Sequence, residues 1–314
     1  MKTKLTQMLG IDYPILCGGM YGLSEATLVS SVCNAGGLGF IATGHFTGKE
    51  MLRDEINKTR ALTDKPFGVN ISLLKESKND LSRDFIDVVI EEKVSVVETA
   101  GNDPSELINR LKAGGVKVLH KVVTSRHAIK AVEAGADAII LVGYSAGGHP
   151  GMEEVCLFVN LPETIASVYV PVIAAGGIAT GKGMASAIMM GADGVLMGSA
   201  FAVTEESLFH RKIKERLVDS KSTDTAVVFK TIRNAFRCLK NDLTKEILEK
   251  ERQCATPEEL LKYLKGFDAH KSYLEGDIEN IFIPIGQVIG LINDIPTCKV
   301  LIDRIVSEYK SIVT

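Results

Sequence analysis

Short apolar runs alternate with segments of helical periodicity along the first two thirds of the chain. Eight runs rich in valine, isoleucine and alanine are bounded by glycine or polar residues, as buried parallel strands are. They span residues 14–18, 38–44, 67–74, 94–100, 117–123, 138–144, 171–177 and 194–201. The segments between them repeat apolar residues at the period of a helix, so each run and its following segment form one βα unit.

The number of βα units predicts how the sheet closes. Eight parallel strands, each followed by a helix, make up the (β/α)8 TIM barrel. A doubly wound sheet is the alternative, but the G-x-G-x-x-G turn of its dinucleotide-binding form is absent after the first run. We therefore predict a cofactor-binding (β/α)8 barrel over residues 1–204.

The character of the sequence changes after this point. Residues 205–277 are charged, have helical spacing and contain no strand-like run. They predict a helical insertion that caps one end of the barrel and serves as a substrate domain. Residues 278–314 return to amphipathic helical spacing, so we expect C-terminal helices that pack back on the barrel.

Composition narrows the classes of partner. The formal net charge of −3 offers no basic surface for nucleic acid. No apolar run approaches the roughly 20 residues of a membrane helix, and the first residues lack a signal-peptide pattern. We expect a cytoplasmic protein with a small-molecule substrate and no membrane insertion; a homodimer is one assembly that the sequence leaves open. The six cysteines show no C-x-x-C pair, and H-E-x-x-H is absent, so we predict no metal site.

Candidate site residues cluster where the predicted strands end. Active sites of barrel enzymes lie at the carboxyl ends of the strands. Gly18, Gly19 and Met20 follow the first run, which suits a flat ring laid across the barrel mouth. Asn70 lies in the third run and Lys121 ends the fifth. Asn70 is as consistent with a satisfied core amide as with a ligand contact. We expect Glu98, in the fourth run, to neutralise Lys121.

Glycines after the last two runs predict an anion site. Their backbone amides can approach a phosphate, although turns also use glycine for its backbone angles alone. Because two adjacent turns carry them, we favour phosphate binding. The residues are Ala175, Gly176 and Gly177 in one turn and Met197, Gly198 and Ser199 in the next.

A histidine follows the sixth run in the turn Gly147-Gly148-His149-Pro150. An ordinary imidazole pKa of about 6.5 suits a base or a hydrogen-bonding group, and we assign catalysis to His149. A solvated loop histidine is the plain alternative. Among the other histidines, only His45, which follows the second run, is also placed to lie in the pocket. A phosphate-bearing planar cofactor beside a histidine, with no Ser-His-Asp pattern, favours redox chemistry with bound FMN.

Several motifs together resemble one family. VCNAGGLGF (32–40), LTDKPFGVNISLL (62–74), AGGHPG (146–151) and AAGGIATGKG (174–183) are similar to the nitronate monooxygenases, formerly called 2-nitropropane dioxygenases. VKVLHKVVTSRHA (116–128) and GDIENIFIPIGQVIGLINDIPTC (276–298) resemble the branch described as NADH:quinone reductases. The flavin-dependent enoyl-acyl-carrier-protein reductases form a related branch, with the same LTDKPFGVN and GGH motifs.

The resemblance implies an FMN-dependent oxidoreductase with FMN bound non-covalently. Its substrates would be alkyl nitronates and O2, or NAD(P)H and a quinone-like acceptor; an enoyl-acyl-carrier-protein reductase is the alternative. FMN contacts would come from Gly19, Met20, Asn70, Lys121, Gly176, Gly177, Gly198 and Ser199, with His149 on the reactive side. Cys17 stands where relatives often have glutamine, and Ala200 where many have arginine; both departures bear on the pocket.

Two hypotheses of other classes remain. A barrel without flavin could use the same phosphate turns to bind a sugar phosphate, with Glu98 and Lys121 as its acid and base. A regulatory protein could keep the cofactor site without activity.

Overall fold

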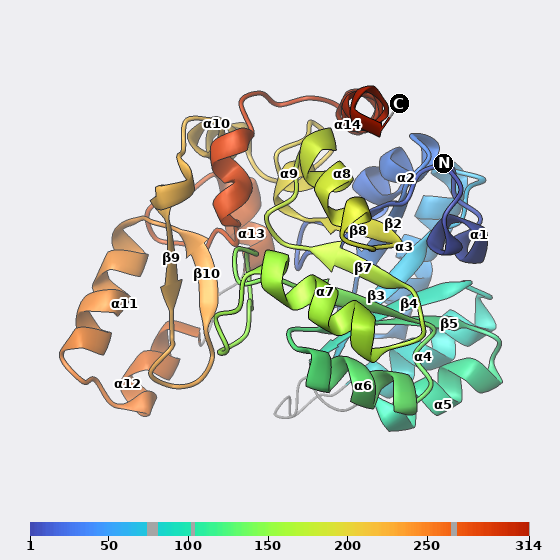
Figure 1. Ribbon diagram of the computed structural model, residues 1–314. Coiled ribbons are helices and arrows are strands. Elements are labelled where there is room, and N and C mark those ends of the chain that lie inside the picture. The colour runs from blue at the N-terminus through green and yellow to red at the C-terminus, as the bar shows by residue number, and fades with distance from the viewer. Residues whose placement is uncertain (74–80, 102–103, 265–268, 314) are drawn as a thin grey trace.

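The computed structural model describes residues 1–73, 81–101, 104–264 and 269–313, so residue 74 of the expected third strand lies outside it. Eight parallel strands pair in chain order, and β8 pairs with β1, which closes the barrel (Figure 1). The predicted (β/α)8 barrel is confirmed. The strands are β1 (Ile15–Cys17), β2 (Leu38–Ala42), β3 (Gly68–Leu73), β4 (Val96–Gly101), β5 (Lys117–Val122), β6 (Ala138–Val142), β7 (Val172–Ala175) and β8 (Gly194–Met197).

Helices surround the barrel, one after each strand, because parallel neighbours need a crossover connection. They are α2 (Ala26–Asn34), α3 (Lys49–Leu62), α4 (Ser82–Glu91), α5 (Ser105–Ala113), α6 (Ser125–Glu133), α7 (Leu157–Ser167) and α8 (Gly181–Met189). A short helix α9 (Ser199–Ala202) follows β8. Among the helices of the described residues, none has the length and apolar character needed to cross a bilayer.

The barrel interior is packed with the side chains that alternate inward along the strands. Helix α1 (Lys4–Leu9), which the βα pattern does not predict, adds Leu5 and Leu9 to this cluster and closes its N-terminal end. Gly68 is glycine for a steric reason: a Cβ there would lie 2.4 Å from Cδ1 of the buried Phe40 ring. The strand members of the cluster are Leu16, Leu38, Phe40, Val96, Leu119, Ala138, Ile140, Ile173, Ala175 and Leu196.

The segment over residues 205–277, here called the cap, lies beside the barrel (Figure 1). Its helical parts are α10 (Arg211–Val218), η1 (Ser222–Asp224), α11 (Asp242–Arg252), α12 (Pro257–Leu261), η2 (Lys262–Leu264) and α13 (Ala269–Glu275). The expectation that it contains no strand is wrong. β9 (Thr225–Val228) and β10 (Phe236–Leu239) form an antiparallel pair. Four-residue strands are too short for periodicity to separate them from helix.

The expectation of continuous helical structure after residue 278 is also wrong. Residues 278–297 contain only the 3-10 helix η3 (Gln287–Leu291), and a long helix, α14 (Cys298–Val313), follows. Pro284 and Pro296 interrupt the backbone hydrogen bonding that a helix would need there. Helix α14 packs against α2 and α8 on the outside of the barrel, where the Glu308 carboxylate accepts a 2.6 Å hydrogen bond from the Gly181 amide.

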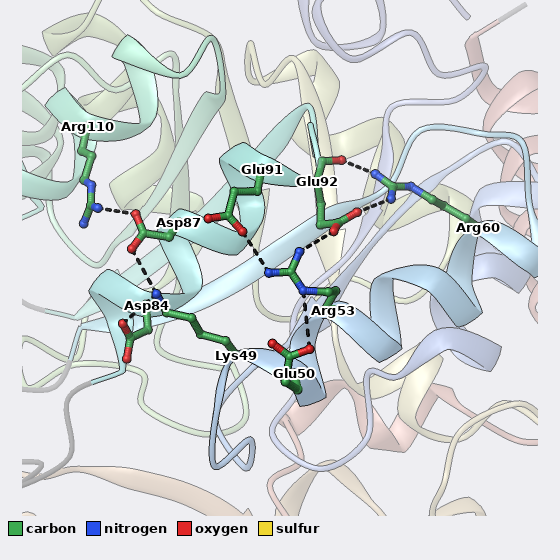
Figure 2. Close-up of polar contacts among 9 residues, drawn as sticks. All are labelled: Lys49, Glu50, Arg53, Arg60, Asp84, Asp87, Glu91, Glu92 and Arg110. Carbon is green, nitrogen blue, oxygen red and sulfur yellow. Dashed lines mark hydrogen bonds and ion pairs between the residues drawn. The ribbon is translucent and has the colours of Figure 1, made fainter.

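A network of ion pairs joins α3, α4 and α5 on the outer surface (Figure 2). Arg53 of α3 donates to Glu91 at 2.9 Å and to Glu92 at 2.7 Å, and Arg60 donates to Glu92 at 2.6 Å. Glu92 is the carboxylate that two guanidinium groups share, and Arg60 and Arg53 hold its pKa below the usual value. Networks of this kind stabilise more than isolated surface pairs do.

We predict that Glu92→Gln lowers the free energy of unfolding at pH 7 by no more than about 1 kcal/mol, because the site is partly screened by solvent. The folded-state pKa of Glu92 lies below its unfolded value of about 4.3. The contribution of Glu92 to the free energy of unfolding is therefore fully present above about pH 4.3 and is lost as the pH falls through the folded-state pKa. The difference between the two proteins in urea unfolding should narrow as the pH falls below about 4.3, the unfolded-state value. Glu50→Gln, at a residue 80% exposed with one contact of 3.6 Å, is the control and should change little.

Candidate active site

Three polar side chains point into the barrel at the carboxyl ends of β3, β4 and β5. The Asn70 amide donates to Glu98 Oε1 at 2.7 Å, and the Lys121 ammonium forms an ion pair with the same oxygen. The predicted neutralisation of Lys121 by Glu98 is thus present. Glu98 is fully buried, and its Oε2 has no hydrogen-bond partner among the described residues. A buried, half-satisfied carboxylate is costly, which marks this position as one where a further group could bind.

The turn after β1 packs directly on this group. A Cβ on Gly19 would lie 2.3 Å from Asn70 Cβ, and one on Gly18 would lie 3.5 Å from Lys121 Nζ. Only glycine therefore permits this turn to lie so close to the polar side chains. The Ser24 hydroxyl fixes the turn, because it accepts from the Met20 amide at 2.9 Å and donates to the Gly18 carbonyl at 3.2 Å.

The turns after β7 and β8 present unpaired backbone amides. Gly176 and Gly177 have φ of +88° and +81°, angles that a glycine adopts without strain. Among the described residues, none accepts a hydrogen bond from the amides of Gly176, Gly177 or Gly198. In barrel enzymes these two turns, with a short extra helix such as α9, commonly hold a phosphate. The turns for which the sequence predicts phosphate binding thus have backbone amides without an acceptor in the described part of the chain.

Ala175 and Met197 are predicted cofactor contacts whose carbonyls and side chains are engaged within the protein. The Ala175 carbonyl accepts from the Gly143 amide at 2.9 Å, and the Met197 carbonyl accepts from the Gly18 amide at 3.1 Å. Both side chains are buried: Ala175 lies in the barrel interior, and Met197 belongs to the core layer between the strands and the helices.

Ser199, the first residue of α9, links the barrel to the chain beyond the cap. Its hydroxyl accepts from the Gly286 amide at 2.9 Å. The residues after Gly286 reach the β6 loop as well, because the Gln287 amide donates to the Ser145 carbonyl at 2.9 Å. Gly147 is packed here too, since a Cβ on it would lie 2.7 Å from the Ile285 carbonyl carbon. The loops after β6 and β8 are thereby held in one position.

His149 lies where the β6 loop meets the cap. Its side chain is exposed, and its ring packs edge-on against Phe236 of β10 with centroids 4.9 Å apart. Gly148, with φ of +74°, exchanges two backbone hydrogen bonds with Arg237. Crowding by neighbouring protein atoms lowers the pKa of His149 below 6.5, and a hydrogen bond with Asn234 opposes that shift in part. This shift favours the neutral form of the imidazole.

Arg237 is a site residue that the sequence reasoning missed. The residue is 4% exposed, and its guanidinium donates to the Tyr144 carbonyl and to the Thr225 hydroxyl at 3.1 Å each and lies 5.1 Å from the centroid of the Tyr144 ring. It thus fixes both ends of the glycine-rich loop that carries His149. No local signal could have found it, because the contact depends on the pairing of β9 with β10.

Other candidates lie away from the inner group. Cys17 is fully buried in the core layer between strands and helices, where desolvation raises the pKa of its thiol well above the usual value. Ala200 is also buried. These two departures from the family pattern therefore lie outside the inner polar group. His45 contacts Glu25 and His270 instead of Asn70, Glu98 or Lys121.

A closed eight-stranded barrel with a polar group and anion-binding turns at the carboxyl ends of its strands defines a (β/α)8-barrel enzyme. The family model for nitronate monooxygenase matches residues 2–308, and the chain belongs to that family, an oxidoreductase family.

Proteins similar along most of the chain carry several names. FabK from Thermotoga maritima is 39% identical with a TM-score of 0.93, over 100% of this chain and 97% of that one. A (3aS,4S,5R,7aS)-5-hydroxy-7a-methyl-1-oxo-octahydro-1H-indene-4-carboxyl-CoA dehydrogenase of Rhodococcus jostii is 34% identical over 98% of this chain and 96% of its own length. A probable nitronate monooxygenase of Staphylococcus aureus is 35% identical over 72% of this chain and 75% of its own.

The Lys121–Glu98 pair gives a prediction about stability. Lys121→Met should leave the buried Glu98 carboxylate without its counter-ion and cost about 3 kcal/mol of unfolding free energy at pH 8. The double change Lys121→Met with Glu98→Gln should recover most of that loss, because it removes the charge together with its partner. Urea unfolding of the four proteins of the cycle measures the coupling. Additive losses would show that the two side chains do not stabilise each other.

Proposed function

We propose that this protein is an FMN-dependent oxidoreductase that reduces the double bond of an enoyl thioester with electrons from NADH or NADPH. The observation that carries the cofactor assignment is the set of unpaired amides at Gly176, Gly177 and Gly198 in the same barrel mouth as the buried Lys121–Glu98 pair. FMN combines a phosphate with a flat, electron-poor ring. The glycine amides match the phosphate, and Lys121 matches the ring.

The residues of the mouth fit FMN. The amides after β7 and β8 would hold the phosphate, since unpaired N–H groups favour an anion. The glycine turn at Gly18 and Gly19 leaves no side chain between the backbone and a flat ring. Lys121, ion-paired within a mostly apolar barrel, would face negative charge on that ring. Bound FMN would supply two-electron redox chemistry between a nicotinamide and a second substrate.

The substrate class is argued from the whole-chain relatives. FabK is an enoyl-acyl-carrier-protein reductase, and the Rhodococcus jostii relative is named for a coenzyme A thioester. Both cover nearly all of this chain, the cap included. Because the cap contributes Phe236, Asn234 and Arg237 around His149, we assign recognition of the thioester to this region.

His149 would act as a neutral hydrogen-bonding group. With its pKa below 6.5, the imidazole can donate one N–H to a substrate carbonyl and keep one nitrogen as an acceptor. Arg237 is a positioning residue: it holds Gly148 and the Tyr144 carbonyl, and so sets where His149 stands.

Nitronate oxidation is the second candidate function. The family match and the Staphylococcus aureus relative favour it. The lowered pKa of His149 argues against a cationic partner for an anionic nitronate at pH 7, whereas a neutral hydrogen-bond donor remains compatible with it. NADH:quinone reduction, the other activity that the resemblance implies, uses the same cofactor and nicotinamide.

Steady-state assays of the purified protein separate these substrates. We expect NADH or NADPH oxidation to depend on crotonyl-coenzyme A under anaerobic conditions. Oxygen uptake with propionate 3-nitronate and no nicotinamide would instead favour nitronate oxidation, and nicotinamide oxidation driven only by a quinone would favour the quinone reductase. A colourless protein that does not bind added FMN would contradict the flavin assignment and favour a sugar-phosphate barrel or a regulatory protein.

FMN binding can be tested apart from activity with Gly198→Val. A Cβ at Gly198 would meet only Met20 Sδ, at 3.7 Å, and its φ of −109° is open to any residue. The change should leave the fold of the apoprotein intact but fill space beside the phosphate donors. We expect FMN affinity, measured by flavin fluorescence, to fall at least about tenfold. Gly48→Val, at an open glycine before α3, is the control; equal loss there would contradict the assignment.

His149→Ala should lower kcat/KM about 100-fold or more and leave FMN bound, because general acid–base and hydrogen-bonding groups contribute on this scale. With a pKa lowered from 6.5, the neutral ring persists through neutral pH. Wild-type activity should therefore fall as the pH drops through the lowered pKa of His149, and His149→Gln should abolish that acid limb while keeping part of the rate. Loss of FMN from either variant would show that His149 is a cofactor ligand instead.

A further inference from the structure

We propose that Glu25, His45 and His270 form a binding site for one divalent transition-metal ion between the barrel and the cap. Glu25 is the residue before α2, His45 lies in the loop after β2, and His270 lies in the first turn of α13. The three are far apart in the sequence and show no metal-binding spacing. Only the docking of α13 on the barrel brings them together.

The distances suit ligands of a single ion. Glu25 Oε1 lies 3.1 Å from His45 Nε2 and 3.0 Å from His270 Nε2, and all three ligand atoms lie within 4.8 Å of one another. Ligands bound at roughly 2.0–2.2 Å from one metal stand about 3.0–3.6 Å apart. Two imidazoles and a carboxylate are the donor set of zinc and non-haem iron sites.

One adjustment is needed for both imidazoles to face a common ion. The rings of His45 and His270 are stacked, with centroids 4.9 Å apart and planes 7° from parallel. Rotation of one ring about its side-chain bonds turns its lone pair toward the other two ligands. His270, with 32% of its side chain exposed, has room to rotate, whereas His45, at 11%, is held by its neighbours.

Charge and protonation at the cluster are compatible with a cation. Glu25 supplies an anionic oxygen that both imidazole Nε2 atoms face, at 3.1 and 3.0 Å. His45 Nδ1 is buried and has no hydrogen-bond partner in the described part of the chain. The 3.1 Å contact with Glu25 Oε1, an acceptor, places a hydrogen on Nε2, and metal binding at Nε2 would require the tautomer with that hydrogen on Nδ1.

The surroundings leave coordination positions open. Glu25 also lines a surface hollow of about 410 Å³, whose other acidic residues are Glu55 and Glu206. Three protein ligands beside such a hollow leave places for water. The site lies at a tight contact of the two parts: a Cβ on Gly22 would be 3.2 Å from His270 Cα. A bound ion would therefore fasten α13 of the cap to the loops after β1 and β2.

Metal binding can be measured on the full-length protein without reference to turnover. Titration of metal-free protein with Zn²⁺ by calorimetry should give one ion per chain, and Co²⁺ should produce visible absorption bands of a site with nitrogen and oxygen ligands. Binding should also raise the melting temperature, because an ion that binds only the folded state stabilises it.

Three single changes test the ligands. His45→Gln, His270→Gln and Glu25→Gln should each weaken Zn²⁺ binding by more than the roughly 10–100-fold that loss of an outer-shell partner costs. Glu25→Gln keeps an oxygen that can accept from both imidazoles, so the fold should survive it. His127→Gln on α6 is the control and should bind as the wild type does. Absence of Zn²⁺ binding in the wild type, or equal binding in His270→Gln, would overturn the proposal.

Discussion

The hydrogen bonding of β8 to β1 is the constraint on which the rest of this structure depends. Pairing of Leu16 with Leu196 closes the sheet, and the alternation of side chains along each strand then fixes which residues face the barrel interior. Closure also brings every βα turn to one end. The Gly18 amide donates to the Met197 carbonyl across this seam, so the first and last turns of the barrel are neighbours.

The polar group inside the barrel is tolerated because its members satisfy one another. Glu98 is fully buried, and it takes the charge of Lys121 and the amide of Asn70 on a single oxygen. The remaining Glu98 oxygen has no partner among the described residues, which is unusual for a buried group. The glycine amides after β7 and β8 lie at the same end of the barrel, in turns that are partly exposed. Free polar groups gathered at one end of a well-packed barrel are what a polar cofactor requires, and they occur here beside glycines that keep the backbone accessible.

The cap and the segment after it meet the barrel through a shared apolar core and through specific hydrogen bonds. Phe209, Ile213 and Tyr273 of the cap belong to the same buried cluster as the barrel's strands and helices. Arg237 and Gly148 exchange backbone hydrogen bonds, and the Gly286 amide reaches Ser199. The cap has its own small core around Phe229, Cys238 and Phe282. Docking of the cap on the barrel also gives the Glu25, His45 and His270 cluster a structural purpose at the opposite edge of the contact.

Local sequence determined the βα units, the barrel, the inward polar residues and the glycine turns. Each depends on periodicity within a strand or on a glycine next to it, which are properties of neighbours in the chain. Only the tertiary structure decided the β9–β10 pair, the role of Arg237 and the meeting of His45 with His270. These features arise from contacts between residues far apart in the chain, such as Arg237 with Tyr144. The burial and pairing that stabilise these features form only in the folded protein. The residues next to one another in the sequence therefore show no pattern that predicts them.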